Sequence, residues 1–414
     1  MKSFLRRFLC AATVGMSCAS ASAQAPIAPV VPLDPTPPVT MMSTSTNAVI
    51  MQPDVPVTQG MWVQTDYLLF AMKSGAATVP LVTSSNNPAT IGAIGEPGTR
   101  VIFGAGAGDN IYQDLFSGIR LTGGYSFGPL LSMEASAFVL FQREIGFNAF
   151  SNGGADDQIS IPFNATQPFN GNPAGETSLN AGGAANTVTI SAPSRFWGTE
   201  LNFILNNRRT ETTSVDFLVG YRYMQLKEGL GINDTFSDPI TGGIVSINDR
   251  FDTQNEYYGA QVGARGSIQL GRFTFRGTAK VSVGVINQSL TTSGESLVTN
   301  GAFGFASGNT PGGVFTQASN LGTYRNSDVA VAPEFQFDAA YSVSERFRIH
   351  AGYNFLALTN VVRPGNNIDR NVNPTQNNVF GGGGPIVGSA TPVATLNTSD
   401  FWVQGLNVGL EFRW

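Results

Sequence analysis

Alternation of apolar and polar residues with a period of two is the feature that most restricts the fold of this chain. The C-terminal residues 400–414 (DFWVQGLNVGLEFRW) show it well, with Leu406, Val408 and Leu410 on one side and Asn407 and Gly409 between them. Successive side chains of a strand point to opposite faces, so such a segment predicts a strand with one apolar face. Ten segments have this pattern: 61–72, 117–127, 130–142, 195–205, 213–225, 256–270, 272–286, 329–342, 345–357 and 400–414.

The connections between these segments alternate in length, and the apolar faces carry no charged residue. Tight turns are expected at 127–130, 206–213, 270–273 and 342–345, and long loops rich in Gly, Asn and Ser at 73–116, 143–194, 226–255, 287–328 and 358–399. Short turns at one end and long loops at the other are typical of barrels that cross a membrane. We therefore expect an all-β fold, a closed antiparallel transmembrane β-barrel of about ten strands (range 10–14) with short periplasmic turns and long extracellular loops. A soluble barrel is the alternative, and the segments 186–191 and 243–249 could add strands.

The N-terminal residues are expected to be a targeting segment followed by a linker. Residues 1–23 have a basic start, a short apolar core and an A-x-A site at 21–23, which is the pattern of a secretory signal peptide. Residues 24–59 are rich in proline and are predicted to be a flexible periplasmic linker, with the barrel over 60–414. Cys10 and Cys18 are the two cysteines of the chain, so the mature protein would have no disulfide and no thiol site.

Charge is low and slightly acidic. Charged residues make up 12% of the chain and the formal net charge is −5. Lys2, Arg6 and Arg7 lie in the expected signal peptide, so the mature chain would be more acidic still. This balance excludes a nucleic-acid partner, which requires a basic face.

The opposite faces of the predicted strands carry the charged residues and are expected to line the lumen. Acidic and basic groups are nearly balanced, so we expect them to pair or meet water and to give weak ion selectivity. The predicted lumen-facing residues are Asp66, Arg120, Glu134, Glu200, Asp216, Arg222, Arg265, Arg276, Lys280, Glu334, Asp338, Arg346, Arg348, His350, Glu411 and Arg413. Aromatic residues at strand ends are expected at the membrane interface: Trp197, Tyr223, Tyr341, Trp402 and Trp414.

Catalysis has little support in the sequence. His350 is the only histidine and could act as a general base, but no hydroxyl nucleophile can be assigned to it. Asp156 and Asp157 are far short of a calcium ligand set, and the Gly-rich residues 104–108 lack the strand and helix of a nucleotide site. We expect no catalytic residue, no metal and no cofactor.

Several segments together resemble the beta-barrel porin-7 family of bacterial outer-membrane proteins. They occur in order along the chain: WVQTDYLLFAMKSGAATVPLVTSS (62–85), GYRYMQLKEGLGI (220–232), NDRFDTQNEYYGAQVGA (248–264), VAPEFQFDAAYSV (331–343), GYNFLALTNVVRPGNNID (352–369) and DFWVQGLNVGLEFRW (400–414). The resemblance implies an outer-membrane barrel and a porin-like role, without a defined substrate or catalytic residues.

Three functional expectations follow, in order. The first is a passive channel for small solutes in the bacterial outer membrane. The second is a structural or surface-interaction barrel with a closed lumen and exposed loops, and the third is an omptin-like or lipase-like barrel enzyme. The expected partners are outer-membrane lipid and, through the C-terminal strand that ends in Trp414, the barrel-insertion machinery. A homo-oligomer is one of the open alternatives.

Overall fold

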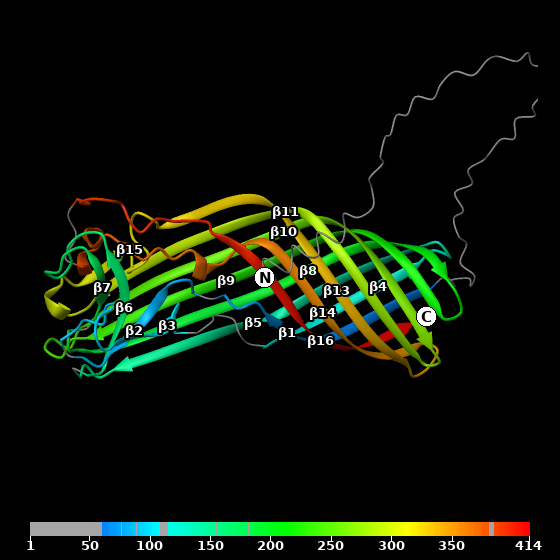
Figure 1. The fold of residues 1–414 in the computed structure, drawn as a ribbon, viewed down its shortest axis with the longest axis horizontal. Helices are drawn as coiled ribbons and strands as arrows, with labels where there is room; N and C mark the ends of the chain where they lie inside the picture. Colours follow the sequence, from blue (N-terminus) through cyan, green and yellow to red (C-terminus); the bar gives the residue numbers. More distant parts are fainter. Residues whose placement is uncertain are drawn as a thin grey trace, which may run out of the picture. The chain divides into compact units, whose positions relative to one another are not determined.

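Ten long antiparallel strands close into a ring. The computed structural model describes residues 60–414 except 76, 88, 108–114, 155, 181 and 381–384. The expected signal peptide (1–23) and linker (24–59) lie outside the described residues. The strands of the ring (Figure 1) are β1 (Gly60–Met72), β4 (Leu115–Ser126), β5 (Leu131–Ser151), β8 (Ala185–Arg209), β9 (Thr213–Ser237), β10 (Ile244–Leu270), β11 (Phe273–Val298), β13 (Gly322–Ser342), β14 (Phe347–Val362) and β16 (Thr398–Arg413).

Each strand of the ring pairs with its neighbour along the chain, and the last strand pairs with the first. The order runs from β1 through β4, β5, β8, β9, β10, β11, β13 and β14 to β16. β16 then pairs with β1 from Trp62↔Arg413 to Met72↔Val403. Closure leaves no ring strand with an unpaired edge, which is the condition for strands to cross lipid. The predicted closed antiparallel barrel of about ten strands is therefore confirmed.

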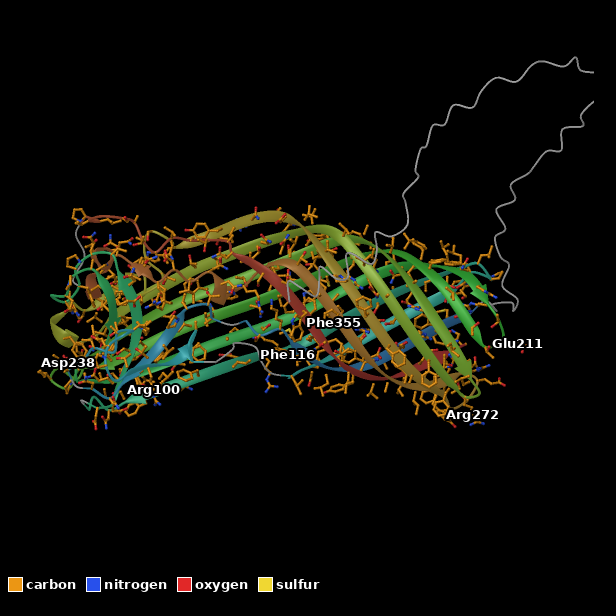
Figure 2. The ribbon with its side chains drawn as sticks, in the orientation of Figure 1. Arg100, Phe116, Glu211, Asp238, Arg272 and Phe355 are labelled. Atoms are coloured by element: carbon orange, nitrogen blue, oxygen red, sulfur yellow. The ribbon has the colours of Figure 1, made fainter. Side chains whose placement is uncertain are left out.

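The two ends of the ring differ as the sequence predicts. At one end, here called the turn end, the reversals are short, and the turn at Gly271–Arg272 needs only two residues. Gly271 has φ +60° there, a left-handed conformation that glycine adopts without steric cost. The other end, the loop end, carries the longer connections. Figure 2 places Glu211 and Arg272 at the turn end and Arg100 and Asp238 at the loop end.

Several strands continue far beyond the segments that the sequence predicts. The expected loop at 226–255 is wrong, because β9 and β10 occupy nearly all of it and only a short turn separates Ser237 from Ile244. The segments 186–191 and 243–249 do not form new strands but lengthen β8 and β10. The reason is a change of face: below this region the apolar residues point outward, and within it they point inward.

The connecting segments at the loop end form a second, small sheet. It consists of β15 (Asn371–Val372), β6 (Gln158–Ala165), β2 (Pro80–Ser85) and β3 (Thr99–Gly104) in that order, with β7 (Gly175–Leu179) also paired to β6. Its side chains share one apolar core with the inward faces of the long strands, in which Phe163 of β6 meets Ile190, Ile232 and Ile247. The loop end is thus a packed structure and not a set of open loops.

The remaining elements are short. β12 (Gly308–Pro311) pairs with the end of β11, and the 3-10 helices are η1 (Ala302–Gly304), η2 (Pro364–Asn366), η3 (Pro374–Gln376) and η4 (Asn378–Phe380). Within the described ranges there is no helix long and apolar enough to span a bilayer.

An apolar belt surrounds the turn-end part of the ring. Outward side chains of β9 and β11 such as Phe217, Val219 and Val283 are about half exposed, which suits contact with hydrocarbon and not with water. The belt ends where outward residues become polar, at Gln225 and Lys227 on β9. Everything beyond that level, toward the loop end, lies outside the membrane-spanning part.

Candidate functional site: the lumen of the barrel

The lumen has three levels along its axis. A polar level occupies the turn-end part, an apolar layer follows, and the packed loop end closes the ring above them. Inward side chains of the ring strands supply the polar level, and it contains the predicted lumen-facing residues with one exception. Arg346 lies exposed in the turn between β13 and β14, because the chain reverses at 343–346 and the strand alternation begins only at Phe347.

Four buried charges form an alternating cluster at the centre of the polar level, here called the quartet. Lys280 Nζ lies 2.7 Å from Glu200 Oε1 and 3.1 Å from Glu334 Oε2. Arg222 pairs with the same two carboxylates. Two cations and two anions at short range neutralise one another, which is how charges are tolerated in a site with little water. Gln261 adds a hydrogen bond to Glu200 at 3.1 Å.

His350 belongs to a second polar group, on the strands that close the ring. Its Nε2 lies 2.6 Å from Asp66 Oδ1 and 3.1 Å from Gln64 Nε2. Asn407 donates to Asp66 at 2.9 Å and to Asp338 at 3.2 Å. The partners of His350 are thus a carboxylate and an amide, and the described side chains show no hydroxyl placed for activation by this imidazole.

Two further groups complete the polar level. Arg265 makes a two-pronged contact with Glu134, with both distances at 2.9 Å, and Arg209 lies 3.6 Å from Asp216. Arg120 donates to Asn354 at 3.0 Å. Near the turn end, Glu411 is approached by the three arginines Arg276, Arg348 and Arg413. Charges that the sequence shows as balanced overall are therefore unevenly distributed along the axis.

A layer of apolar side chains crosses the lumen above the polar level. It is drawn from most strands of the ring and is almost fully buried: Leu68, Phe70, Met72, Phe116, Leu140, Phe196, Met224, Leu226, Tyr257, Ile286, Ala330, Ala332, Leu356, Leu358, Val361, Phe401 and Val403. Phe196 meets Phe138 and Phe401 in edge-on contacts with ring centres 5.2 and 5.4 Å apart. Aromatic edges packed in this way fill the cross-section of a ten-stranded ring.

The segment that follows β14 turns into the lumen and is tied there by polar contacts, here called the latch. Asn255 of β10 donates to the Val362 carbonyl at 2.8 Å and accepts from its amide at 2.9 Å, as a strand neighbour would. Arg363 then forms a two-pronged ion pair with Glu228 of β9, at 2.9 and 2.7 Å. Arg363 also donates to the carbonyls of Lys73 and Ser74 and lies 5.7 Å from the Phe401 ring.

The latch residues are missing from the predicted site. Glu228 continues the inward parity of Arg222 along β9, so strict alternation could have placed it in the lumen. Arg363 gives no such signal, because the register of β14 shifts between Leu358 and Val361 and Asn360 has φ +59°. A bulge of this kind re-aims the residues that follow it.

The cavities within the polar level are small. One is lined by Arg120, Glu200 and Arg222 beneath the apolar layer, and another by Trp62, Glu134 and Arg276 nearer the turn end. Each has a volume of about 30 Å³, enough for only a few water molecules. The described His, Asp and Glu side chains do not gather in groups suited to a metal ion.

Two buried aspartates lie in the loop-end core, outside the membrane-spanning part. Asp249 accepts hydrogen bonds from the amides of Val314, Phe315 and Thr316 at 2.8 to 3.0 Å, and burial raises its pKa to about 6. Burial also raises the pKa of Asp234 well above its ordinary value, although Asn186 donates to it at 3.1 Å. Asp249 thus holds the 313–316 segment against β10.

The predicted interface aromatics lie on the outer surface at two levels. Trp197 and Tyr223 contact each other and continue through Tyr258 just below the polar boundary of the belt, with ring centres 5.1 and 4.9 Å apart. At the turn end Tyr341 meets Phe273 and Trp414 meets Phe412. Trp402 lies on β16 opposite Ala357. Two aromatic levels on either side of an apolar belt match the girdles of membrane barrels.

The ring, the belt and the inward charges define a membrane β-barrel with a filled lumen. The chain belongs to the beta barrel porin-7 (BBP7) family, whose model matches residues 62–414. A search of curated protein sequences gave no match.

Solved structures with a similar fold include outer-membrane barrels of low identity. The outer membrane protease OmpT from Escherichia coli has 9% identity and a TM-score of 0.38, with 86% of this chain and 99% of that chain covered. A FadL homologue from Pseudomonas aeruginosa has 6% identity and a TM-score of 0.22, covering 86% and 90%. An anion-selective porin from Comamonas acidovorans has 8% identity and a TM-score of 0.16, covering 87% and 100%. The barrel assignment itself rests on the strand pairings.

Proposed function

We propose that this protein is an outer-membrane β-barrel with a closed lumen, which acts as a structural or surface-interaction component of the bacterial envelope. The observation that carries the proposal is the buried apolar layer across the lumen. Leu68, Phe196 and Leu226 have at most 1% of their surface exposed, so water does not reach this level. A dry apolar constriction stops hydrated ions, because an ion would lose its water there without gaining a ligand.

The latch supports the same function from above. Its Arg363–Glu228 pair is buried, and both residues lie over the apolar layer where a solute would have to pass. The second sheet and its core then fill the remaining width of the ring. A barrel closed at two consecutive levels presents a folded loop end to its surroundings, which suits contact with another envelope component.

A passive channel for small solutes is the second candidate function. The polar level favours it, because Arg276 and Arg413 are accessible from the turn end and the family carries porin in its name. In a channel, the latch and at least part of the apolar layer would have to move aside. Neither candidate assigns a catalytic role to His350, whose contacts suit the positioning of neighbouring strands.

Localisation and partners belong to the same proposal. We place the barrel in the bacterial outer membrane, with the turn end toward the periplasm and lipid around the apolar belt. The C-terminal β16, which closes the ring and is followed by Trp414, is the segment that would be read by the barrel-insertion machinery. Loss of surface exposure in cells with intact inner membranes, or recovery in the inner-membrane fraction, would contradict this placement.

Conductance in planar bilayers tests the closed lumen. We expect the purified native protein to give no discrete current steps at up to about 100 mV. The double substitution Phe196→Ser/Phe401→Ser removes an aromatic contact of the apolar layer and should give steps. The matched pair Phe163→Ser/Phe169→Ser removes a similar contact in the loop-end core, with ring centres 5.5 Å apart, and should not. Regular steps from the native protein would reject the closed barrel and favour the channel.

A further inference from the structure

Five arginines gather at the turn end of four neighbouring strands. Arg276 of β11, Arg348 of β14 and Arg413 of β16 point inward around Glu411. Backbone hydrogen bonds bring two more close: the Arg272 carbonyl accepts from Ser342, and the Arg346 carbonyl accepts from Arg413. We call this group the arginine mouth. Figure 2 labels Arg272 at this end.

The three inward arginines have more charge and more donors than Glu411 can satisfy. Arg276 and Arg348 each lie 3.8 Å from the carboxylate, near enough for attraction but too far for a good hydrogen bond. Each guanidinium has five N–H donors, while one carboxylate offers about four acceptor positions. The Nε of Arg348 is buried and has no hydrogen-bond partner among the described atoms.

The quartet shows that this arrangement is not a general property of the lumen. There, two carboxylates meet two cations, and the Lys280 contacts are 2.7 and 3.1 Å. At the mouth the nearest further acid is Asp338, opposite Arg276 in the strand register, and it already accepts from Asn407. The arginine mouth therefore keeps an excess of positive charge.

The mouth is also accessible to solutes. The side chains of Arg276, Arg348 and Arg413 are 22%, 16% and 40% exposed, whereas that of Lys280 in the quartet is 2% exposed. Arg276 also lines the lower polar cavity, which provides room for water behind the site. An anion could thus enter from the turn end and stay partly hydrated.

From this geometry we propose that the arginine mouth binds a phosphate group, with Arg276, Arg348 and Arg413 as its ligands. Guanidinium forks match the spacing of phosphate oxygens, and arginine is preferred over lysine where several oxygens are held at once. The phosphate could belong to an anionic lipid headgroup of the adjacent leaflet or to a small soluble molecule. The inference does not depend on whether the lumen conducts.

Calorimetry on the full protein in dodecyl maltoside, which contains no phosphate, tests the site. We expect inorganic phosphate to bind and sodium chloride at the same ionic strength to give no comparable heat. Arg276→Gln and Arg348→Gln should each weaken phosphate binding by about tenfold or more, the loss of a charge-assisted hydrogen bond. Arg195→Gln changes an exposed arginine near the loop end and is the matched control.

Two further measurements keep the result interpretable. Glu411→Gln removes the competing carboxylate and should strengthen phosphate binding, whereas a purely structural role of the arginines predicts no gain. Mixed micelles with phosphatidylglycerol or with phosphatidylcholine distinguish the sources: preference for phosphatidylglycerol that is lost in Arg348→Gln identifies a lipid headgroup, and its absence together with phosphate binding identifies a soluble ligand. No phosphate or phosphatidylglycerol binding above the chloride control, or equal binding by all variants, would overturn the proposal.

Discussion

At the scale of single residues, the quartet is the group whose loss should cost most. Arg222 is shared by Glu200 and Glu334, so Arg222→Met would leave two buried carboxylates with one lysine. We expect a loss of about 3–5 kcal/mol in the free energy of unfolding, because an unpaired charge remains in a site with little water. Urea titration of the detergent-solubilised protein, followed by tryptophan fluorescence, measures this change.

Removing one charge of each sign from the quartet provides the control. Lys280→Met/Glu334→Gln leaves Arg222 facing Glu200, so the remaining charges still match. Its cost should be clearly smaller than that of Arg222→Met, although it changes two residues instead of one. An equal or greater loss in the double variant would show that charge balance is not what stabilises this level.

Asp234 makes the loop end sensitive to pH. Its pKa in the folded state lies above the ordinary 3.8, mainly because it is buried. The protonated acid is therefore favoured by folding: its contribution to stability is complete below about pH 4 and is lost as the pH rises through the folded pKa. Asp234→Asn should accordingly raise the free energy of unfolding at pH 8 by at least about 1 kcal/mol, with little change at pH 4.

Thermal unfolding at several pH values measures the effect of Asp234. The matched control is Asp252→Asn, since Asp252 lies on the outer face of β10 with 41% of its side chain exposed. It should give a small change that is the same at each pH. A native protein whose stability rises between pH 4 and pH 8 by the same amount as the Asp234→Asn variant would contradict the assignment.

At the scale of elements, the long strands carry two opposite faces in succession. On β9, Val219 and Tyr221 face lipid on one side of the strand, while Leu230 and Ile232 face the core on the other side. The apolar residues therefore change parity along one continuous strand. A pattern search that follows a single parity stops at this change, which is why the sequence predicts a loop where the strand continues.

This change of face marks what could and could not be predicted. The membrane-facing half follows from alternation alone, since lipid selects an uncharged face over many residues. Even inward charges such as Glu200 and Lys280 follow from parity. Their partners do not, because pairing across the ring depends on strand tilt and stagger that alternation does not specify. The latch and the arginine mouth likewise join residues that are far apart in the sequence.

The position of the lipid belt gives a prediction at the same scale. Val283→Arg places a charge on the outer face of β11 inside the belt, where it should cost about 2–4 kcal/mol. Asn287→Arg places the same charge on the same face four residues further along, beyond Val285 at the edge of the belt. That variant should change stability by less than about 1 kcal/mol. Refolding into phosphatidylcholine vesicles and urea titration compare the two, and equal costs would show that the belt is misplaced.

At the scale of the whole molecule, the ring depends on every strand to remain without edges. β16 joins β14 to β1 and is the last strand of the chain. Its removal would expose two strand edges and leave apolar faces at a gap, so the remaining strands should associate between molecules instead of closing. We therefore expect a protein truncated at residue 397 to aggregate on refolding into detergent.

Migration on a denaturing gel without heating measures closure directly. The native protein should run as a compact species that shifts to its full apparent mass after boiling, whereas the truncated protein should show no compact band at either temperature. Trp414→Ala is the matched control, because it shortens one exposed side chain at the chain end and leaves all strand pairs of β16 in place. It should retain the compact band. A compact, heat-sensitive band from the truncated protein would mean that nine strands can close without β16, and that the ring is less dependent on its order than the pairings indicate.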